Sequence, residues 1–447
     1  MTDKISSRQL KFSVYMTADG NYHLGGWRLP TAYADAGQNV SRWIEAAHTL
    51  ERGKIDMLFI ADNISPQGVD HLPSMSHSPR SVGFEPLTLL SALSMVTSRL
   101  GLAATSATTW NEPYTVARMF ASLDHLSGGR AAWNVVTGRN PEDARNFSRT
   151  SHVAHEDRYR RAEEFVDVVK GLWDSYEDHA IVRDRASGLF FDPDKFHLLG
   201  HAGQYFSVKG PLSVSRPPQG HPVIVQAGES EAARQLSARV ADAVFTQQSS
   251  LKSAQVFYRD MKRRLDQFGR TLESLKVLPG LSAYIGRTRE EAEEKYENLQ
   301  AMTPPEYAVR QLGLLLGADL SGYPLDETMP HLEATATRAN PERWLEFSRD
   351  ANLTLRQAAL RATASKAHFV VKGTASDVAD QIEEWFKGDA ADGFNLLPPH
   401  IPGSLNEFVD HVLPELRRRG LFRVEYEGTT LRENLGLPRP PNSLANR

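Results

Sequence analysis

The sequence lacks several features, and each absence excludes a class of protein. None of the 447 residues is cysteine, which excludes disulfides, thiolate metal sites, iron–sulfur clusters and a cysteine nucleophile. No apolar run reaches the roughly 20 residues that a membrane-spanning helix needs. A net charge of −4 gives no support for a basic face that binds nucleic acid. The amino-terminal residues show no signal-peptide pattern, so we expect a cytoplasmic protein with neither nucleic acid nor membrane as a partner.

The signatures of several common catalytic machineries are absent too. The sequence contains no G-x-S-x-G nucleophile elbow, no H-E-x-x-H zinc motif and no Walker loop. His152 and His155 are three residues apart, but no carboxylate stands at a recognisable ligand spacing from them, so we expect no metal site. The expected source of the chemistry is therefore a bound organic cofactor.

Short apolar runs alternate with helical periodicity along the chain. The expected strands cover residues 11–16, 55–62, 100–109, 130–138, 222–228, 241–247, 275–286 and 392–399. The expected helices between and after them include 40–53, 86–98, 113–129, 155–174, 230–241, 251–269 and 404–419. Eight alternations predict an α/β fold, a (β/α)8 TIM barrel, with a doubly wound sheet as the alternative. The G-x-G-x-x-G fingerprint of a dinucleotide-binding sheet is absent.

The chain is much longer than the roughly 250 residues of a typical barrel. We interpret residues 1–447 as one barrel domain with insertions at about 63–85, 175–220 and 301–373. Long insertions in compact domains serve as lids, binding loops or oligomer contacts. The third insertion follows the seventh strand and emerges on the active-site face, so it is interpreted as an active-site lid or an oligomer contact.

Polar residues, few of them charged, stand where the predicted strands end. Asp62 closes the second strand, Thr105 lies near the end of the third, and Asn134 and Thr137 lie near the end of the fourth. In (β/α)8 barrels the active site lies at the carboxyl ends of the strands. A lining of neutral hydrogen-bonding groups suits a large heteroaromatic ligand better than metal-assisted hydrolysis.

The stretch "VIVQAGESEAAR" (223–234) leads from a buried strand through Gly228 into a helix that starts near Ser230. Free backbone N–H groups at a helix start, together with a serine hydroxyl, form an anion site. The alternative is that Ser230 only caps the helix. The local sequence leaves both interpretations open.

Two further stretches carry candidate ligand contacts. His155 and Tyr159 are four residues apart on a predicted helix, so they share one face and can contact the same ligand. The glycine-rich stretch "GNYHLGGWRLP" (20–30) follows the first strand and carries His23, Trp27 and Arg28. These three form a candidate pocket wall, although aromatic and arginine side chains also pack in ordinary loops.

Several stretches, in order along the chain, resemble the bacterial luciferase-like flavin-dependent monooxygenase family. They are "ERGKIDMLFIAD", "EPLTLLSAL", "ARMFASLDHLSGGRAAWNVVTG", "ARNF", "HEDRYRRAEEF", "VKGLWDS", "QAGESEAAR", "ADGFNLLP" and "LRENLGL". The resemblance is greatest to the subgroup of nitrilotriacetate and EDTA monooxygenase component A, dibenzothiophene-sulfone monooxygenase and a pristinamycin synthase subunit. It is weakest over residues 301–370, on the substrate side.

The resemblance implies a luciferase-like barrel that uses reduced FMN and O2 and works with a separate NAD(P)H:flavin oxidoreductase. It implies a homodimer or homotetramer. The implied reaction inserts one oxygen atom into an organonitrogen or organosulfur compound, such as an aminopolycarboxylate, a sulfone or a thioether, and C–N or C–S cleavage follows. Two alternatives remain: a deazaflavin-dependent oxidoreductase of the same superfamily, and a non-catalytic flavin-binding subunit.

The resemblance also implies which residues surround the flavin. They are Asp62, Ala104 and Thr105 beside the ring, Asn134 and Thr137 along the ring or ribityl chain, His155 and Tyr159 towards the phosphate, and Gly228, Glu229 and Ser230 on the phosphate. His23, Trp27 and Arg28 are the candidate catalytic residues on the substrate side.

Overall fold

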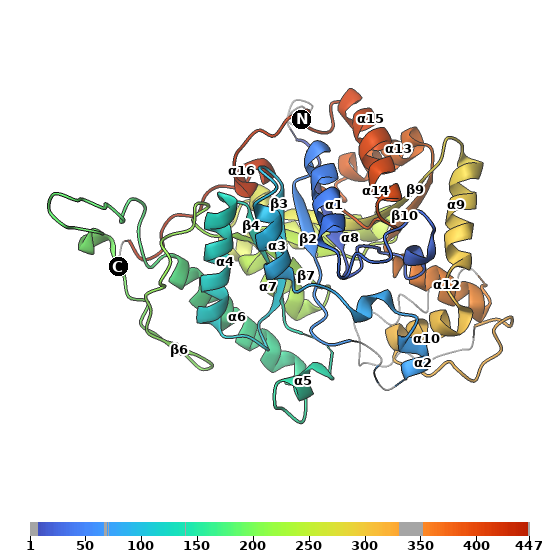
Figure 1. The fold of residues 1–447 in the computed structure, drawn as a ribbon, viewed down its shortest axis with the longest axis horizontal. Helices are drawn as coiled ribbons and strands as arrows, with labels where there is room; N and C mark the ends of the chain where they lie inside the picture. The colour runs from blue at the N-terminus through green and yellow to red at the C-terminus, as the bar shows by residue number, and fades with distance from the viewer. Residues whose placement is uncertain (1–7, 67–68, 70, 139, 330–351, 446–447) are drawn as a thin grey trace.

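A computed structural model describes residues 8–66, 69, 71–138, 140–329 and 352–445. Its centre is a closed barrel of eight parallel strands with helices outside it (Figure 1). The strands are β1 (Lys11–Met16), β2 (Met57–Ile60), β3 (Gly101–Ala107), β4 (Ala131–Val136), β7 (Val223–Ala227), β8 (Ala243–Thr246), β9 (Lys276–Ile285) and β11 (Gly393–Leu396). Each lies within its predicted range. The ring closes where β8 pairs with β9 and β11 pairs with β1, which confirms the predicted barrel.

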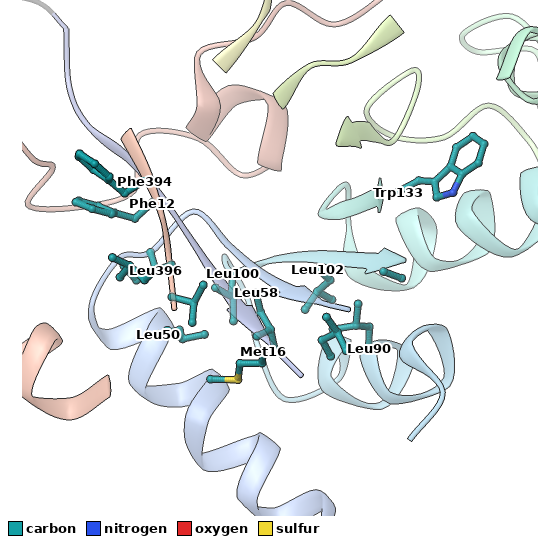
Figure 2. Close-up of a cluster of buried hydrophobic side chains, with 14 of the residues drawn as sticks. Phe12, Met16, Leu50, Leu58, Leu90, Leu100, Leu102, Trp133, Phe394 and Leu396 are labelled. Carbon is teal, nitrogen blue, oxygen red and sulfur yellow. The ribbon is translucent and has the colours of Figure 1, made fainter. Parts of the chain in front are cut away.

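Helices cover the barrel because one side of each strand is apolar. The helices between the strands include α1 (Val40–Arg52), α3 (Pro86–Ser94), α4 (Pro113–Ser127), α6 (His155–Trp173), α7 (Glu231–Val240), α8 (Leu251–Arg264), α9 (Arg289–Ala301) and α13 (Ala375–Lys387). Figure 2 shows Leu58 and Leu102 of the strands beside Leu50 of α1 and Leu90 of α3. These four side chains are fully buried, and each such burial contributes about 1.5–3 kcal/mol to folding.

The helix predicted over 404–419 is interrupted. The chain forms α14 (Gly403–Glu407), one π-helical turn (Phe408–Val412) and α15 (Leu413–Arg418). Pro414 has no N–H to donate to the preceding turn, and its ring crowds the carbonyl four residues earlier. The π turn widens the helix just before this proline and so accommodates it.

The short helix α16 (Leu431–Leu435) closes the amino-terminal end of the barrel. Leu431 and Leu435 pack in the barrel interior. The Lys11 ammonium donates to the carbonyl of Asn434 at 2.7 Å. Ligand access is therefore expected at the opposite end, where the strands finish.

The three predicted insertions contain little regular structure. Residues 63–85 hold α2 (Leu72–Met75), and 175–220 hold β5 (His201–Ala202) and β6 (Ser207–Val208). Residues 301–373 hold α10 (Pro305–Leu316) and α12 (Leu355–Ser365), which pack on each other near α2 (Figure 1). Residues 330–351 of this proposed lid lie outside the described residues. The same insertion ends in β10 (Phe369–Gly373), a parallel partner of β9 that the sequence did not predict.

The strand register arranges the inward-facing side chains in layers. Outer residues such as Phe12, Leu58 and Phe394 alternate with inner ones along each strand. Following the register around the barrel places Phe59, Asn134, Phe245 and Asn395 in one layer. The next layer towards the carboxyl ends holds Tyr15, Thr105, Ala227 and Gly280. Together these two layers form the floor of the barrel mouth.

Candidate functional site

Asn134 and Thr105 form a hydrogen-bonded pair on neighbouring strands at this floor. The Asn134 amide nitrogen donates to the Thr105 hydroxyl at 2.9 Å, and that hydroxyl donates to the carbonyl of Ile60 at 2.8 Å. Both side chains are buried, and the amide oxygen of Asn134 has no hydrogen-bond partner among the described residues. An unsatisfied buried acceptor is costly, so this oxygen is a candidate acceptor for a ligand donor.

Asp62 lies just beyond the end of β2 and is partly buried. Burial, and then the nearby charges of Glu85 and Asp143, raise the pKa of this carboxyl to about 6. The group therefore carries a proton over part of the near-neutral range, unlike an ordinary aspartate. A carboxyl of this kind can donate a hydrogen bond to a ligand, or accept one after it ionises.

The junction between β7 and α7 requires a glycine at position 228. Gly228 has a φ of +150°, which side chains rarely adopt, and a Cβ there would lie 2.7 Å from that of Ala233. Ser230 caps α7, because its hydroxyl oxygen accepts from the backbone N–H of Ala233 at 3.2 Å. The hydroxyl proton remains able to donate to a ligand. Capping and anion binding are thus compatible at Ser230.

The Glu229 carboxylate is directed towards the end of β8. It accepts hydrogen bonds from the Thr246 hydroxyl at 2.9 Å, the Gln247 backbone N–H at 2.8 Å and the Gln248 amide at 3.2 Å. These donors satisfy the charge and join the β7 and β8 loops. Only the backbone of Glu229 is then expected to contribute to an anion site at the α7 start.

The amino-terminal part of α6 brings His155 and Tyr159 to the same place. Their rings lie 5.0 Å apart between centroids, as their four-residue spacing predicts. The Tyr159 hydroxyl lies 3.8 Å from where a Cβ of Gly228 would stand. Arg158 of the same helix donates to the carbonyl of Gly138, just after Thr137. Helix α6 is therefore fixed between the ends of β4 and β7, with Tyr159 directed at the α7 start.

Ala104 is placed differently from the other predicted cofactor contacts. Its side chain is fully buried in the outer core, among residues that pack the strands against the helices. The neighbours Ala103 and Thr105 face the barrel interior instead. Strand alternation therefore directs the Ala104 side chain away from the mouth, and the expectation that it lines the flavin needs this correction.

The loop after β1 packs on the base of the third insertion. His23 is fully buried, and its Nδ1 accepts from the backbone N–H of Gly25 at 3.0 Å, which leaves the proton on Nε2. Burial is the main cause that lowers the pKa of His23 to about 3, so the ring stays neutral. Arg28 is exposed and donates to the carbonyl of Met302, while Trp27 is half-buried.

Four aromatic side chains over the floor were not predicted as site residues. Tyr15 lies 5.6 Å from Phe245 and 5.9 Å from Tyr22, measured between ring centroids. The His368 ring stacks on Phe245 at 5.1 Å, with only 3° between the planes. Gly280 makes room for it, because a Cβ there would lie 2.2 Å from His368 Nδ1. Tyr15 stands at an inward position of a predicted strand, which is a usable signal, whereas no sequence pattern marks His368.

Three further observations concern the rest of the described residues. The described residues contain no group of three or more histidine, aspartate or glutamate side chains placed to hold a metal ion. A polar surface hollow of about 500 Å³, lined in part by His48, Arg99 and Tyr426, lies at the opposite, amino-terminal face of the barrel. No helix in the described part of the chain is long and apolar enough to span a membrane.

The site fits an elongated ligand with a polar ring system at one end and an anion at the other. Asn134 offers a buried acceptor, Asp62 a titrating carboxyl, and the α7 start offers N–H groups and the Ser230 hydroxyl. These groups suit a flavin mononucleotide, whose ring carries donors and acceptors and whose phosphate matches a helix amino terminus.

Two curated proteins match nearly the whole chain. The chain is 47% identical to nitrilotriacetate monooxygenase component A of Aminobacter aminovorans over 433 residues, which cover 95% of each chain. It is also 47% identical to N-acetyl-S-(2-succino)cysteine monooxygenase of Bacillus subtilis strain 168, over 449 residues and 100% of both chains. Both relatives thus match the barrel and its insertions together.

A solved structure shows the same architecture. The crystal structure of DmoA from Hyphomicrobium sulfonivorans superposes with a TM-score of 0.89 at 30% identity, covering 98% of this chain and 95% of that one. Residues 23–392 match the luciferase-like monooxygenase family. This match spans most of the barrel, including the ends of β2, β4 and β7 that carry the site. The chain therefore belongs to the luciferase-like monooxygenase family and is a flavin-dependent monooxygenase.

Proposed function

We propose that this chain is the oxygenase of a two-component system. It binds reduced FMN supplied by a separate NAD(P)H:flavin oxidoreductase and inserts one atom of O2 beside the nitrogen or sulfur of a small organic compound. Cleavage of a C–N or C–S bond follows. The observation that carries the proposal is the pairing of an unsatisfied Asn134 oxygen in the floor with an anion site at Ser230.

The residues of the site have separate roles in this proposal. Asn134 accepts a hydrogen bond from the ring system of the flavin, and Thr105 holds the amide in place. The backbone from Gly228 to Ser230 and the Ser230 hydroxyl hold the phosphate, and Tyr159 and His155 close over it. The partial positive charge at the amino terminus of α7 attracts the negative phosphate, so this end of the site anchors the cofactor.

Reduced FMN, when bound, supplies the two electrons with which one oxygen atom of O2 enters the substrate and the other leaves as water. The protein keeps bulk water from the reacting atoms, and the aromatic side chains Tyr15, Phe245 and Tyr22 provide a dry wall for this purpose. Asp62 is positioned to hold or release a proton near pH 6. His23, Trp27 and Arg28 lie on the substrate side in this proposal, where Arg28 joins the β1 loop to Met302.

The names of two relatives support a proposal for the substrate class. One relative is named for nitrilotriacetate, an amine that carries carboxylates. The other is named for N-acetyl-S-(2-succino)cysteine, a thioether that carries carboxylates. We propose a small compound of this kind, with carboxylates around the nitrogen or sulfur that is attacked.

The test is oxygen uptake with reduced FMN, a flavin reductase and a panel of aminopolycarboxylates, thioethers and sulfones. One class is expected to consume O2 with matching product and little hydrogen peroxide. Reconstitution with deazaflavin in place of FMN distinguishes the alternative cofactor by absorbance. A non-catalytic flavin-binding subunit would bind FMN and oxidise none of the panel.

A further inference from the structure

Asn395 of β11 and Ser13 of β1 are polar residues inside the barrel, on the far side of the floor from Asn134. They are register partners on neighbouring strands. Both face inward, because Phe12, Val14, Phe394 and Leu396 on either side pack in the outer core. Ser13 is 0% and Asn395 1% exposed, so neither side chain reaches bulk water.

These side chains have hydrogen-bonding capacity that the protein does not use. The Ser13 hydroxyl oxygen and both amide atoms of Asn395 have no partner among the described residues. Leaving such a group unsatisfied in the interior is costly, and three such atoms lie together here. Native proteins satisfy groups of this kind with ordered water.

Aromatic rings separate this polar group from the rest of the floor. Phe59 and Phe245 meet across the barrel at 6.1 Å between centroids, with Asn134 and Asn395 on opposite strands of the same layer. Asn395 is also the register partner of Gly280, whose missing Cβ makes room for the His368 ring. Since neighbouring strands are about 4.8 Å apart, the His368 edge at Gly280 lies close to the Asn395 wall.

His368 is held in the mouth by an unusual backbone. The two residues before it, Lys366 and Ala367, have φ values of +47° and +58°, a left-handed conformation that non-glycine residues seldom adopt. Such conformations persist only where surrounding contacts impose them, and they cluster at functional sites. Stacking on Phe245 and the β10–β9 pairing supply these contacts.

We propose that Ser13 and Asn395 bind an internal water beneath the mouth, and that this hydrated pair positions the His368 ring on the substrate side. Water is the ligand because both side chains donate and accept, carry no charge and are sealed from solvent. Asn395 and Ser13 are then positioning residues that act through His368. The part of His368 in oxygenation rests on the proposed function, whereas the water site does not.

The first test is a crystal structure of the purified protein without flavin, at a resolution that shows ordered water. Density for a water within hydrogen-bond distance of Ser13 Oγ and the Asn395 amide is expected. A dry interior, in which Asn395 finds protein partners instead, would overturn the proposal. This result does not depend on substrate or turnover.

The second test compares Asn395→Leu with Phe394→Leu, which changes the adjacent residue of β11 on the outer face. The imidazole 15N shifts of His368, assigned with His368→Gln, are expected to change in Asn395→Leu and not in the control. Ser13→Ala provides a second, smaller perturbation. With substrate, Asn395→Leu is expected to lower kcat about tenfold with little change in KM, because small displacements of a positioned group reduce rate more than binding.

Two outcomes distinguish a failure of this inference from a failure of the proposed function. Unchanged His368 shifts in folded Asn395→Leu and Ser13→Ala proteins would refute the positioning role. A native protein that oxidises none of the panel, but shows the water and the shift changes, would refute the proposed function and leave the water site standing.

Discussion

Ser230→Ala distinguishes a serine that only caps α7 from one that also binds phosphate. The substitution removes the 3.2 Å bond from the Ala233 N–H, which is expected to lower the free energy of unfolding by about 1 kcal/mol. It also removes a hydroxyl donor to the phosphate, worth about 1–2 kcal/mol of binding. The Kd for reduced FMN should therefore rise roughly 5- to 30-fold.

Ser250→Ala is the matched control. Ser250 caps α8, the next helix around the barrel, and its hydroxyl accepts from the Ser253 N–H at 3.3 Å. We expect this variant to lose about the same stability and to bind FMN normally. Urea denaturation gives the stability, and anaerobic titration of flavin fluorescence gives the Kd. An unchanged Kd in Ser230→Ala, with the same loss of stability as Ser250→Ala, would refute phosphate binding by the hydroxyl and leave only the cap.

Three further outcomes are expected. Asp62→Asn should raise the free energy of unfolding above pH 6 and have no effect below pH 3.8. The reason is that folding raises the pKa of this carboxyl from 3.8 to about 6 and so disfavours its charged form. Urea denaturation of both proteins above pH 6 and below pH 3.8 checks this. Turnover of a substrate that binds no metal should survive a chelator, and a loss reversed by one divalent ion would contradict this. If residues 301–373 form a lid, a short bismaleimide cross-link between His77→Cys and Glu306→Cys should stop turnover, because it would hold the lid in one position. The two sites are near each other, since the rings of His77 and Tyr307 lie 6.1 Å apart between centroids. A cross-link within α10, between Glu306→Cys and Arg310→Cys, should not stop turnover. Retained turnover in the cross-linked His77→Cys/Glu306→Cys protein would refute the lid and leave the oligomer contact as the interpretation.

The sequence was sufficient to predict the barrel strands and their order. Each strand is an apolar run that a helical period follows, and local pattern carries that information. The residues at strand ends were also predictable, because parallel strands in a barrel bring their carboxyl ends together. Tyr159 and Gly228 therefore lie close together although they are far apart along the chain, and Asn134 pairs with Val225 on the strand that leads to Gly228.

The sequence did not predict which side chains of β3 face the barrel interior and which face the helices. In "GLAATSA" every residue is buried and all but Leu102 are small, so no clear polar alternation separates Ala104 from Thr105. Only the register with β2 and β4 settles that Thr105 faces inward. Strand β10 was also missed. "FVVKG" forms a ninth parallel strand outside the eight-strand ring, where it pairs with the end of β9.

The third insertion and His368 are joined through this unexpected strand. Five register pairs, from Phe369 to Gly373, fix β10 on β9 directly after His368, and the His368 N–H also donates to the carbonyl of Ser365 at 2.9 Å. Helix α12 ends at Ser365, and the two left-handed residues Lys366 and Ala367 lie between it and His368. We expect a movement of the insertion to turn about these two residues and to break the hydrogen bond between His368 and Ser365, while β10 stays paired with β9. A lid built in this way can open without moving the ring that stacks on Phe245, so the floor of the mouth keeps its shape while access to it changes.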